Sequence, residues 1–372
     1  MQKKLIALAV AGIMAAPMAA QAAASTEVYG KVRASIDFTD NGDATTTNDD
    51  SRIAASSNAS RLGFKGSDDL DNGMTAKWQI EAEVNMDDGS DLSSGLRNTF
   101  VGLAGGFGEV RLGHHDTPYK MATKDIFGDT RADYNGDSAS ISGVDVKTGP
   151  IRLDNRADNV IAYISPDMSG FMFAVAYVTD LDDDDLVAAK NDNTEGVSVM
   201  GSYTAGPLNV SLAIETLGEA SPFTPAGSTT KDDVEGTKLG VAYDVMEDTT
   251  LRFIYESVDY GTDVTDTVDQ DAFYLSAAHG MGNGITLKAA YGQLDDYGCN
   301  GCNDTGASYF ALGVEKSLSE TTEVYALYAA HDPDKNASVW GLNGVDGASG
   351  SSGDPEATSA FSLGINMKFS SM

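Results

Sequence analysis

The chain has 372 residues, a formal net charge of -32, 40 glycines and only 9 prolines. This length allows two ordinary soluble domains or one large β-barrel. The strongly acidic balance argues against nucleic acid as a partner, because phosphates would be repelled. Mean hydropathy is -0.21, and beyond the first residues no apolar run approaches the roughly 20 residues that a membrane-spanning helix needs. A closed barrel is not excluded, because it also satisfies every backbone group inside a membrane.

The N-terminus predicts export. Two early lysines precede an apolar stretch over residues 5–16, and small residues follow it. An Ala-Gln-Ala triplet fits signal-peptidase cleavage before Ala23, and a second small-residue triplet places the cut before Ser25. We therefore predict a signal peptide over residues 1–22 and one β-barrel over residues 23–372. A short membrane anchor is the alternative for the N-terminal segment.

Most of the remaining chain alternates apolar and polar residues. Within residues 77–86, Trp78 and Ile80 alternate with Lys77 and Glu81. A period of two indicates strands whose two faces differ chemically. The same pattern recurs over residues 31–38, 208–215, 251–255 and 361–369.

The connectors between these segments alternate in length. Short ones span residues 71–73, 104–108, 166–170, 205–207, 246–248, 280–284 and 318–320. Long ones span residues 39–59, 116–155, 181–195, 218–235, 260–270, 294–306 and 332–358. This alternation is typical of an antiparallel up-and-down barrel in an outer membrane, and the segments amount to about sixteen strands.

The strands of a soluble all-β protein also alternate apolar and polar residues. Alternation alone therefore does not show whether the apolar face contacts lipid or a protein core. Here the polar face carries many charges, the N-terminus predicts export, and aromatic residues lie near strand ends, as an interfacial girdle requires. These aromatic residues are Tyr243, Tyr255, Tyr291 and Phe369. We therefore predict that Trp78 and Ile80 face lipid, whereas Lys77, Glu81 and Glu83 face water inside a barrel.

About sixteen strands leave an aqueous lumen, which something should narrow. The longest connector, residues 116–155, is the candidate, because connectors of this size usually have a function. We predict that it folds inward and presents an acidic side, although a merely solvated external loop is the alternative. Its candidate acids are Asp125, Asp129, Asp133 and Asp137.

Basic residues cluster before this connector and predict an opposing basic wall. A basic wall facing an acidic loop would set a field that sorts ions. The alternative is that each cation pairs with a neighbouring lumen acid. The candidates are Lys31, Arg33, Arg61, Lys65, Lys77, Arg97 and Arg111, the last two at positions where alternation is blurred.

Three stretches together, SRLGFKGSDDL, RNTFVGLAGGFGEVRLG and RADNVIAYISPDMSGFMFAVAY, resemble the general porins of Gram-negative outer membranes. The resemblance implies a trimer of sixteen-stranded barrels, each with its third external loop folded inward as a constriction. It implies constriction roles for Lys31, Arg61 and Arg97 on the basic side, and for Asp125 and Asp129 on the acidic side. No cofactor is implied.

The chain departs from this family at two places. Family members usually end on an aromatic residue that the assembly machinery recognises, whereas here Ser370, Ser371 and Met372 follow Phe369. His114 stands where the family often has arginine, so we expect one basic contribution to the constriction to be weakened.

Other candidates are weaker. Cys299 and Cys302 lie in a long connector, and export favours a disulfide over a metal or redox site. The acidic run over residues 182–185 is either a solvated loop or a site for divalent cations shared with lipopolysaccharide. The four histidines lack a glycine-flanked serine, so we expect no enzyme.

These observations predict an outer-membrane channel for passive diffusion of ions and small hydrophilic solutes. Loss of two lysines with the signal peptide lowers the formal charge from -32 to -34. This charge predicts a preference for cations, although the basic wall opposes it. A substrate-specific porin and a structural or adhesive barrel are the alternatives.

Overall fold

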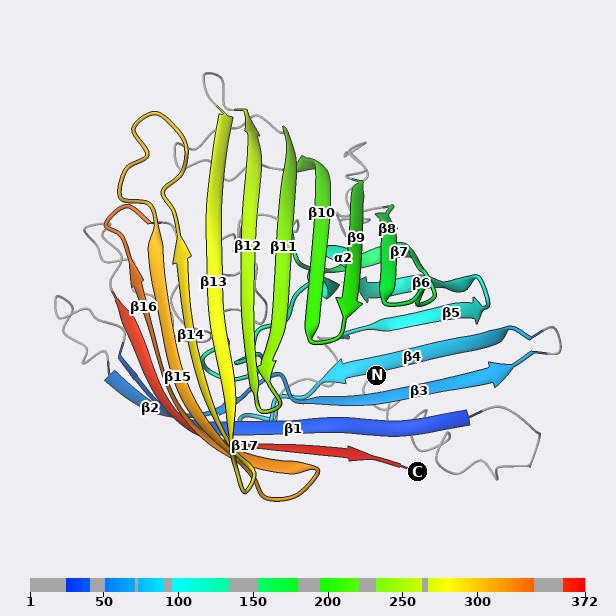
Figure 1. The fold of residues 1–372 in the computed structure, drawn as a ribbon, viewed down its shortest axis with the longest axis horizontal. Helices are drawn as coiled ribbons and strands as arrows, with labels where there is room; N and C mark the ends of the chain where they lie inside the picture. The colour runs from blue at the N-terminus through cyan, green and yellow to red at the C-terminus, as the bar shows by residue number, and fades with distance from the viewer. Residues whose placement is uncertain are drawn as a thin grey trace, which may run out of the picture.

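The computed structural model describes residues 25–40, 51–70, 73–89, 96–133, 153–179, 195–220, 232–262, 267–337 and 357–371. Its strand segments form one antiparallel sheet that follows the chain order, and β17 returns to pair with β1 (Figure 1). The sheet is therefore closed, and the predicted all-β barrel is confirmed. In the described ranges, no helix has the length and apolar character needed to cross a membrane.

Short turns and long connections alternate between the strands. One short turn has two residues and joins the strand ending at Ala205 to the strand beginning at Leu208. A hairpin of this length needs a residue with positive φ, and Gly206 supplies it with φ 57°. The strands are β1 (Ser25–Asp40), β2 (Ser51–Ser57), β3 (Arg61–Asp69), β4 (Thr75–Glu83), β5 (Thr99–Gly105), β6 (Gly108–Asp116), β7 (Arg156–Ile164), β8 (Phe171–Val178), β9 (Gly196–Ala205), β10 (Leu208–Ala220), β11 (Asp232–Met246), β12 (Thr249–Thr262), β13 (Thr267–Gly282), β14 (Ile285–Leu294), β15 (Ala307–Ser317), β16 (Thr322–Pro333) and β17 (Thr358–Ser370); the described helix is α2 (Pro118–Met121).

β2 and β3 act as one strand with an irregular middle. β3 pairs with the first half of β1 and β2 with its second half, so the 17 segments close a barrel of 16 strands. Ala59, between them, has φ 51°. Before this irregularity Ser56 points inward, and after it Arg61 does, so the inward positions change from even to odd numbers. Such a bulge redirects side chains at a chosen place.

The two faces of the barrel wall are inverted relative to a soluble protein. Asp37 on β1 is 0 % exposed, whereas its neighbours Ile36 and Phe38 are 52 % and 42 % exposed. On β17, Ser362 is likewise 0 % exposed beside the exposed Leu363. Water on the outer face would make this arrangement unfavourable, because apolar surface would be exposed while charged groups were buried. The outer face therefore contacts lipid, as predicted.

The strand containing Trp78 and Ile80 is shorter than its alternation suggested. β4 ends at Glu83, so Val84 and Met86 extend the period of two without belonging to the strand. The C-terminal tail extends the pairing of β17 with β1. The backbone N–H of Ser371 donates to Val28 O, with an N···O distance of 2.7 Å.

Candidate functional site

Residues 117–133, here called the inner segment, follow β6 and lie against inward-facing side chains of the barrel. Three groups of contacts hold the segment, on β9–β12, on β13–β16 and on β1, β2 and β17. Because the inward-facing positions are polar, they supply hydrogen-bond partners for a segment that forms little secondary structure of its own.

The first group of contacts holds α2. Thr117 caps this helix by accepting a hydrogen bond from Lys120 N at 3.4 Å. Tyr119 is fully buried, and its hydroxyl donates to Glu256 Oε1 at 2.6 Å. A Cβ atom on Gly236 would lie 2.7 Å from the Tyr119 hydroxyl, so β11 needs glycine at this close approach. Burial and the neighbouring Glu256 raise the pKa of Tyr119, which keeps its hydroxyl a donor.

The second group of contacts holds the middle of the inner segment. Asp125 accepts a hydrogen bond from the Tyr274 hydroxyl and another, of 3.0 Å, from Phe127 N. Burial raises the pKa of the Asp125 carboxyl despite these donors. The Phe127 ring fills the space over Gly313, where a Cβ atom would lie 2.8 Å from it. Asp125 therefore positions the segment and does not face the basic wall.

Arg131 makes the third group of contacts. Its guanidinium lies 2.9 Å from Asp37 Oδ2 and also donates to Ser56 Oγ. Asp37 accepts a further hydrogen bond of 2.6 Å from Ser362 Oγ. Because Asp37 is fully buried, this ion pair joins β1, β2 and β17 to the inner segment in a site from which water is excluded.

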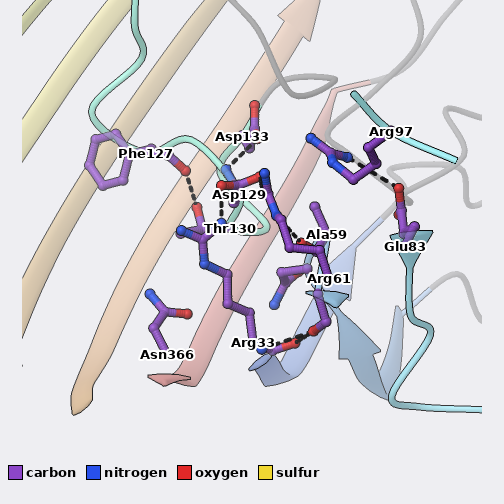
Figure 2. A network of polar contacts seen from close by, with 12 residues as sticks. Arg33, Ala59, Arg61, Glu83, Arg97, Phe127, Asp129, Thr130, Asp133 and Asn366 are labelled. Carbon is purple, nitrogen blue, oxygen red and sulfur yellow. Dashed lines mark hydrogen bonds and ion pairs between the residues drawn. The ribbon is translucent and has the colours of Figure 1, made fainter. Parts of the chain in front are cut away.

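Between these contacts, Asp129 faces two arginines of the wall. Its carboxylate pairs with Arg33 on β1 and lies 2.5 Å from Arg61 Nη2 on β3 (Figure 2). Asp129 has φ 62°, and its backbone N–H donates to the Asp133 carboxylate. Asp133 therefore stabilises the turn that presents Asp129, and Asp129 contacts Arg33 and Arg61 of the basic wall directly.

A second layer of charges lies beside this contact. Arg97 donates to Glu81 at 3.0 Å and to Glu83 at 3.2 Å, both on β4 (Figure 2 shows the contact with Glu83). Arg61 lies 3.8 Å from Glu81, which also accepts a hydrogen bond from Tyr29 at 2.8 Å. Arginines and carboxylates thus alternate across β1, β3 and β4 in one network.

Two lysines extend the basic wall toward the short turns. Lys31 on β1 is the register partner of Lys368 on β17 and of Arg61 on β3, so three cations form one row across adjacent strands. Among the residues that the structure describes, neither lysine has a carboxylate within the 4.0 Å of an ion pair.

The remaining predicted cations lie apart from the inner segment. Lys65 pairs with Glu27 at 3.1 Å, whereas Lys77 and Arg111 both pair with Glu109, at 3.0 and 2.6 Å. These three fit the alternative in which a lumen cation pairs with a neighbouring acid. Asp137 and the acidic run 182–185 lie outside the described residues.

Sequence reasoning missed three charged residues. Arg131 lies between Asp129 and Asp133, a pattern that could have indicated a role for its charge in the acidic segment. Arg156 begins β7 and pairs with Asp116 at 2.8 Å. Lys368 is a polar position of the last strand, and only the closure of the barrel places it beside Lys31.

Cys299 and Cys302 form a disulfide in the connection after β14, with Cα atoms 5.4 Å apart. His114 Nδ1 lies 2.5 Å from Asp158 Oδ1. Within the described ranges, no three His, Cys, Asp or Glu side chains are grouped as a metal ion would require.

A family model described as Gram-negative porin matches residues 7–336. The chain is 29 % identical over 379 residues to outer membrane porin protein 32 of Delftia acidovorans, covering 99 % of this chain and 100 % of that protein. It is 28 % identical over 337 residues to a monosaccharide porin of a Halomonas species, covering 86 % of this chain and 84 % of that protein.

Solved structures show the same fold. An anion-selective porin from Comamonas acidovorans superposes with a TM-score of 0.73 at 24 % identity, covering 93 % of this chain and 100 % of the other. The trimer form of OmpT, an outer membrane protein of Vibrio cholerae, superposes with a TM-score of 0.63 at 19 % identity, again over 93 % and 100 %.

Proposed function

Because the chain belongs to the Gram-negative porin family, we propose that its outer-membrane channel is narrowed where Asp129 meets Arg33 and Arg61. Ions and small hydrophilic solutes diffuse passively through the remaining lumen. Because Asp129 contacts these arginines directly, solutes pass beside this group of fixed charges, and charges that line a narrow section orient polar molecules and discriminate by charge and size.

The observation that carries this proposal is the attachment of the inner segment. Tyr119, Phe127 and Arg131 bind to three different parts of the inner wall, so the acid between them, Asp129, cannot swing freely. A constriction needs such preorganisation, because a mobile loop would not fix the distance between opposite charges.

We further propose that the lumen favours anions over cations. The carboxylates of Glu81 and Asp129 each lie between two guanidinium groups, whereas Lys31 and Lys368 carry charge without a near carboxylate among the described residues. The cation preference expected from net charge finds no support in this geometry. Charges on the outer connectors act over only about 8 Å at physiological salt.

Planar-bilayer recording tests the channel and its constriction together. The purified protein should give discrete conductance steps in potassium chloride, and D129N/R33Q should change the step size while the barrel still assembles. E247Q, which removes an acid from the exposed turn between β11 and β12, serves as the control. Absence of conductance in the wild-type protein would refute the channel, and an unchanged step in D129N/R33Q would refute the constriction.

We also propose a homotrimer in contact with outer-membrane lipid and lipopolysaccharide, with the short turns facing the periplasm. The supporting observations are the lipid-facing exterior of the barrel and the trimer form of OmpT. Crosslinking in outer-membrane fractions should give three bands on a denaturing gel, and a monomer alone would contradict the trimer.

A further inference from the structure

A cavity of about 440 Å³ lies between the inner segment and the wall formed by β8–β12. Its size is within the range of small-molecule sites. Residues 121–124 of the inner segment cover it, and Ser211 secures this cover by donating to Ala122 O at 2.6 Å. Asp244 and Thr250, close to the turn between β11 and β12, lie at its short-turn end. The cavity therefore lies beside the path from the constriction toward the short turns.

Three methionine side chains line one side of this cavity. Met121 on α2, Met172 on β8 and Met200 on β9 all contribute to its lining. Methionine sulfur makes favourable contacts with aromatic rings, and its flexible side chain adapts to ligands of different shape. Met200 belongs to a buried apolar cluster, and Met121 and Met172 pack against it. Where these three side chains line the cavity, they are also suited to the apolar part of a solute.

The opposite side carries a cation. Arg252 on β12 donates one hydrogen bond, of 3.4 Å, to Lys124 O. A guanidinium has five N–H donors, so this contact leaves further donors for a ligand. In the described part of the chain, no carboxylate lies within 4.0 Å of Arg252. Asp244, an acid that lines the cavity, accepts a hydrogen bond from Thr250 Oγ1 at 2.6 Å. The carboxylate of Asp125 accepts hydrogen bonds from the Tyr274 hydroxyl and from Phe127 N.

We propose that this cavity is a binding subsite for small aromatic carboxylates, with the carboxylate on Arg252 and the ring among the three methionines. The proposal rests on the channel function and names a class of solute for it. Arg252 can hold a carboxylate through two parallel hydrogen bonds, a geometry that a lysine cannot reproduce. Ser202 and Asn209 also line the cavity and offer polar groups to a ring that carries a hydroxyl.

The test is conductance in potassium chloride at increasing benzoate concentration. We expect benzoate to reduce the wild-type current saturably, whereas acetate, which lacks the ring, and benzamide, which lacks the charge, do so far less. R252Q should raise the half-saturating benzoate concentration about tenfold, since a hydrogen bond to a charged group is lost. K335Q, which removes one positive charge from an exposed position outside the cavity, should leave that concentration unchanged.

A second variant separates binding from any effect of R252Q on assembly. Ala242→Leu fills the cavity from β11 and keeps the charge of Arg252, its cross-strand neighbour, and it should also abolish the saturable benzoate effect. Equal effects of benzoate and acetate on the wild-type channel, or an unchanged half-saturating concentration in both variants, would overturn the subsite. Failure of the wild-type protein to conduct at all would instead refute the proposed channel.

Discussion

The buried ion pair between Arg131 and Asp37 should decide whether the inner segment stays on the wall. In R131M, Asp37 keeps its hydrogen bonds with Ser362, Ser56 and Ser35 but loses the guanidinium 2.9 Å away. Asp37 is 0 % exposed, so water does not replace the lost partner. Breaking one side of a buried pair costs about 3–5 kcal/mol, because a charge is left uncompensated.

This cost can be converted into a population. Each 1.4 kcal/mol is a factor of ten, so the detached state of the inner segment should become roughly 100-fold to several thousand-fold more populated. Single-channel recording should show this as larger current fluctuations at constant voltage. The urea midpoint for unfolding in lipid vesicles should also fall, provided the slope of the transition is unchanged.

The double variant R131M/D37N supplies the control. It removes both charges, so no carboxylate is left buried without its partner, and it should be less destabilised than the sum of the two single variants. Steady wild-type-like current in R131M would refute the reasoning. So would single-variant effects on stability that add to within about 0.5 kcal/mol, because residues that do not interact behave in that way.

Three further outcomes are expected. K31Q/K368Q should shift the reversal potential in a potassium chloride gradient toward that of potassium, whereas a shift toward chloride would contradict the proposed anion preference. G313V should destabilise the protein in vesicle unfolding assays by more than about 1 kcal/mol, because the added side chain meets the Phe127 ring. Mass spectrometry of the protein from outer membranes should give a mature chain that begins at Ala23, and an intact N-terminus would rule out the signal peptide.

Most of the barrel could be predicted from its sequence because two signals agree. Period-two alternation gave the strands, and the alternating connector lengths gave their order around the barrel. Two exceptions are the region of β2 and β3, where the inward positions change from even to odd at Ala59, and β7, where they change from odd to even at Asn159. Alternation is a local pattern, so a backbone irregularity that resets it is invisible until the pairing with the neighbouring strand is known.

The candidate site was less predictable because it depends on the path of an irregular segment. Sequence placed Asp125, Asp129 and Asp133 together as one acidic side, but their roles differ: Asp129 pairs with Arg33 and Arg61, and Asp133 accepts a hydrogen bond from the Asp129 backbone. Asp125 turns to the opposite wall, where Tyr274 and the backbone bind it. Residue type alone cannot separate these roles, because each acid needs hydrogen-bond donors and the polar lumen offers donors in every direction.

The inverted wall explains why the inner segment can be held by charges at all. In a soluble barrel the interior would be apolar, and burial of Asp37 and Arg131 together would gain little over a hydrophobic pair. Here lipid takes the apolar face, so the inner face must carry polar groups, and a segment lying on it must satisfy them. The inner segment does so at Asp37 and Glu256 through Arg131 and Tyr119. The inner segment is thus attached through polar contacts because lipid surrounds the barrel. Disrupting either contact should change the channel current under conditions that do not yet unfold the barrel.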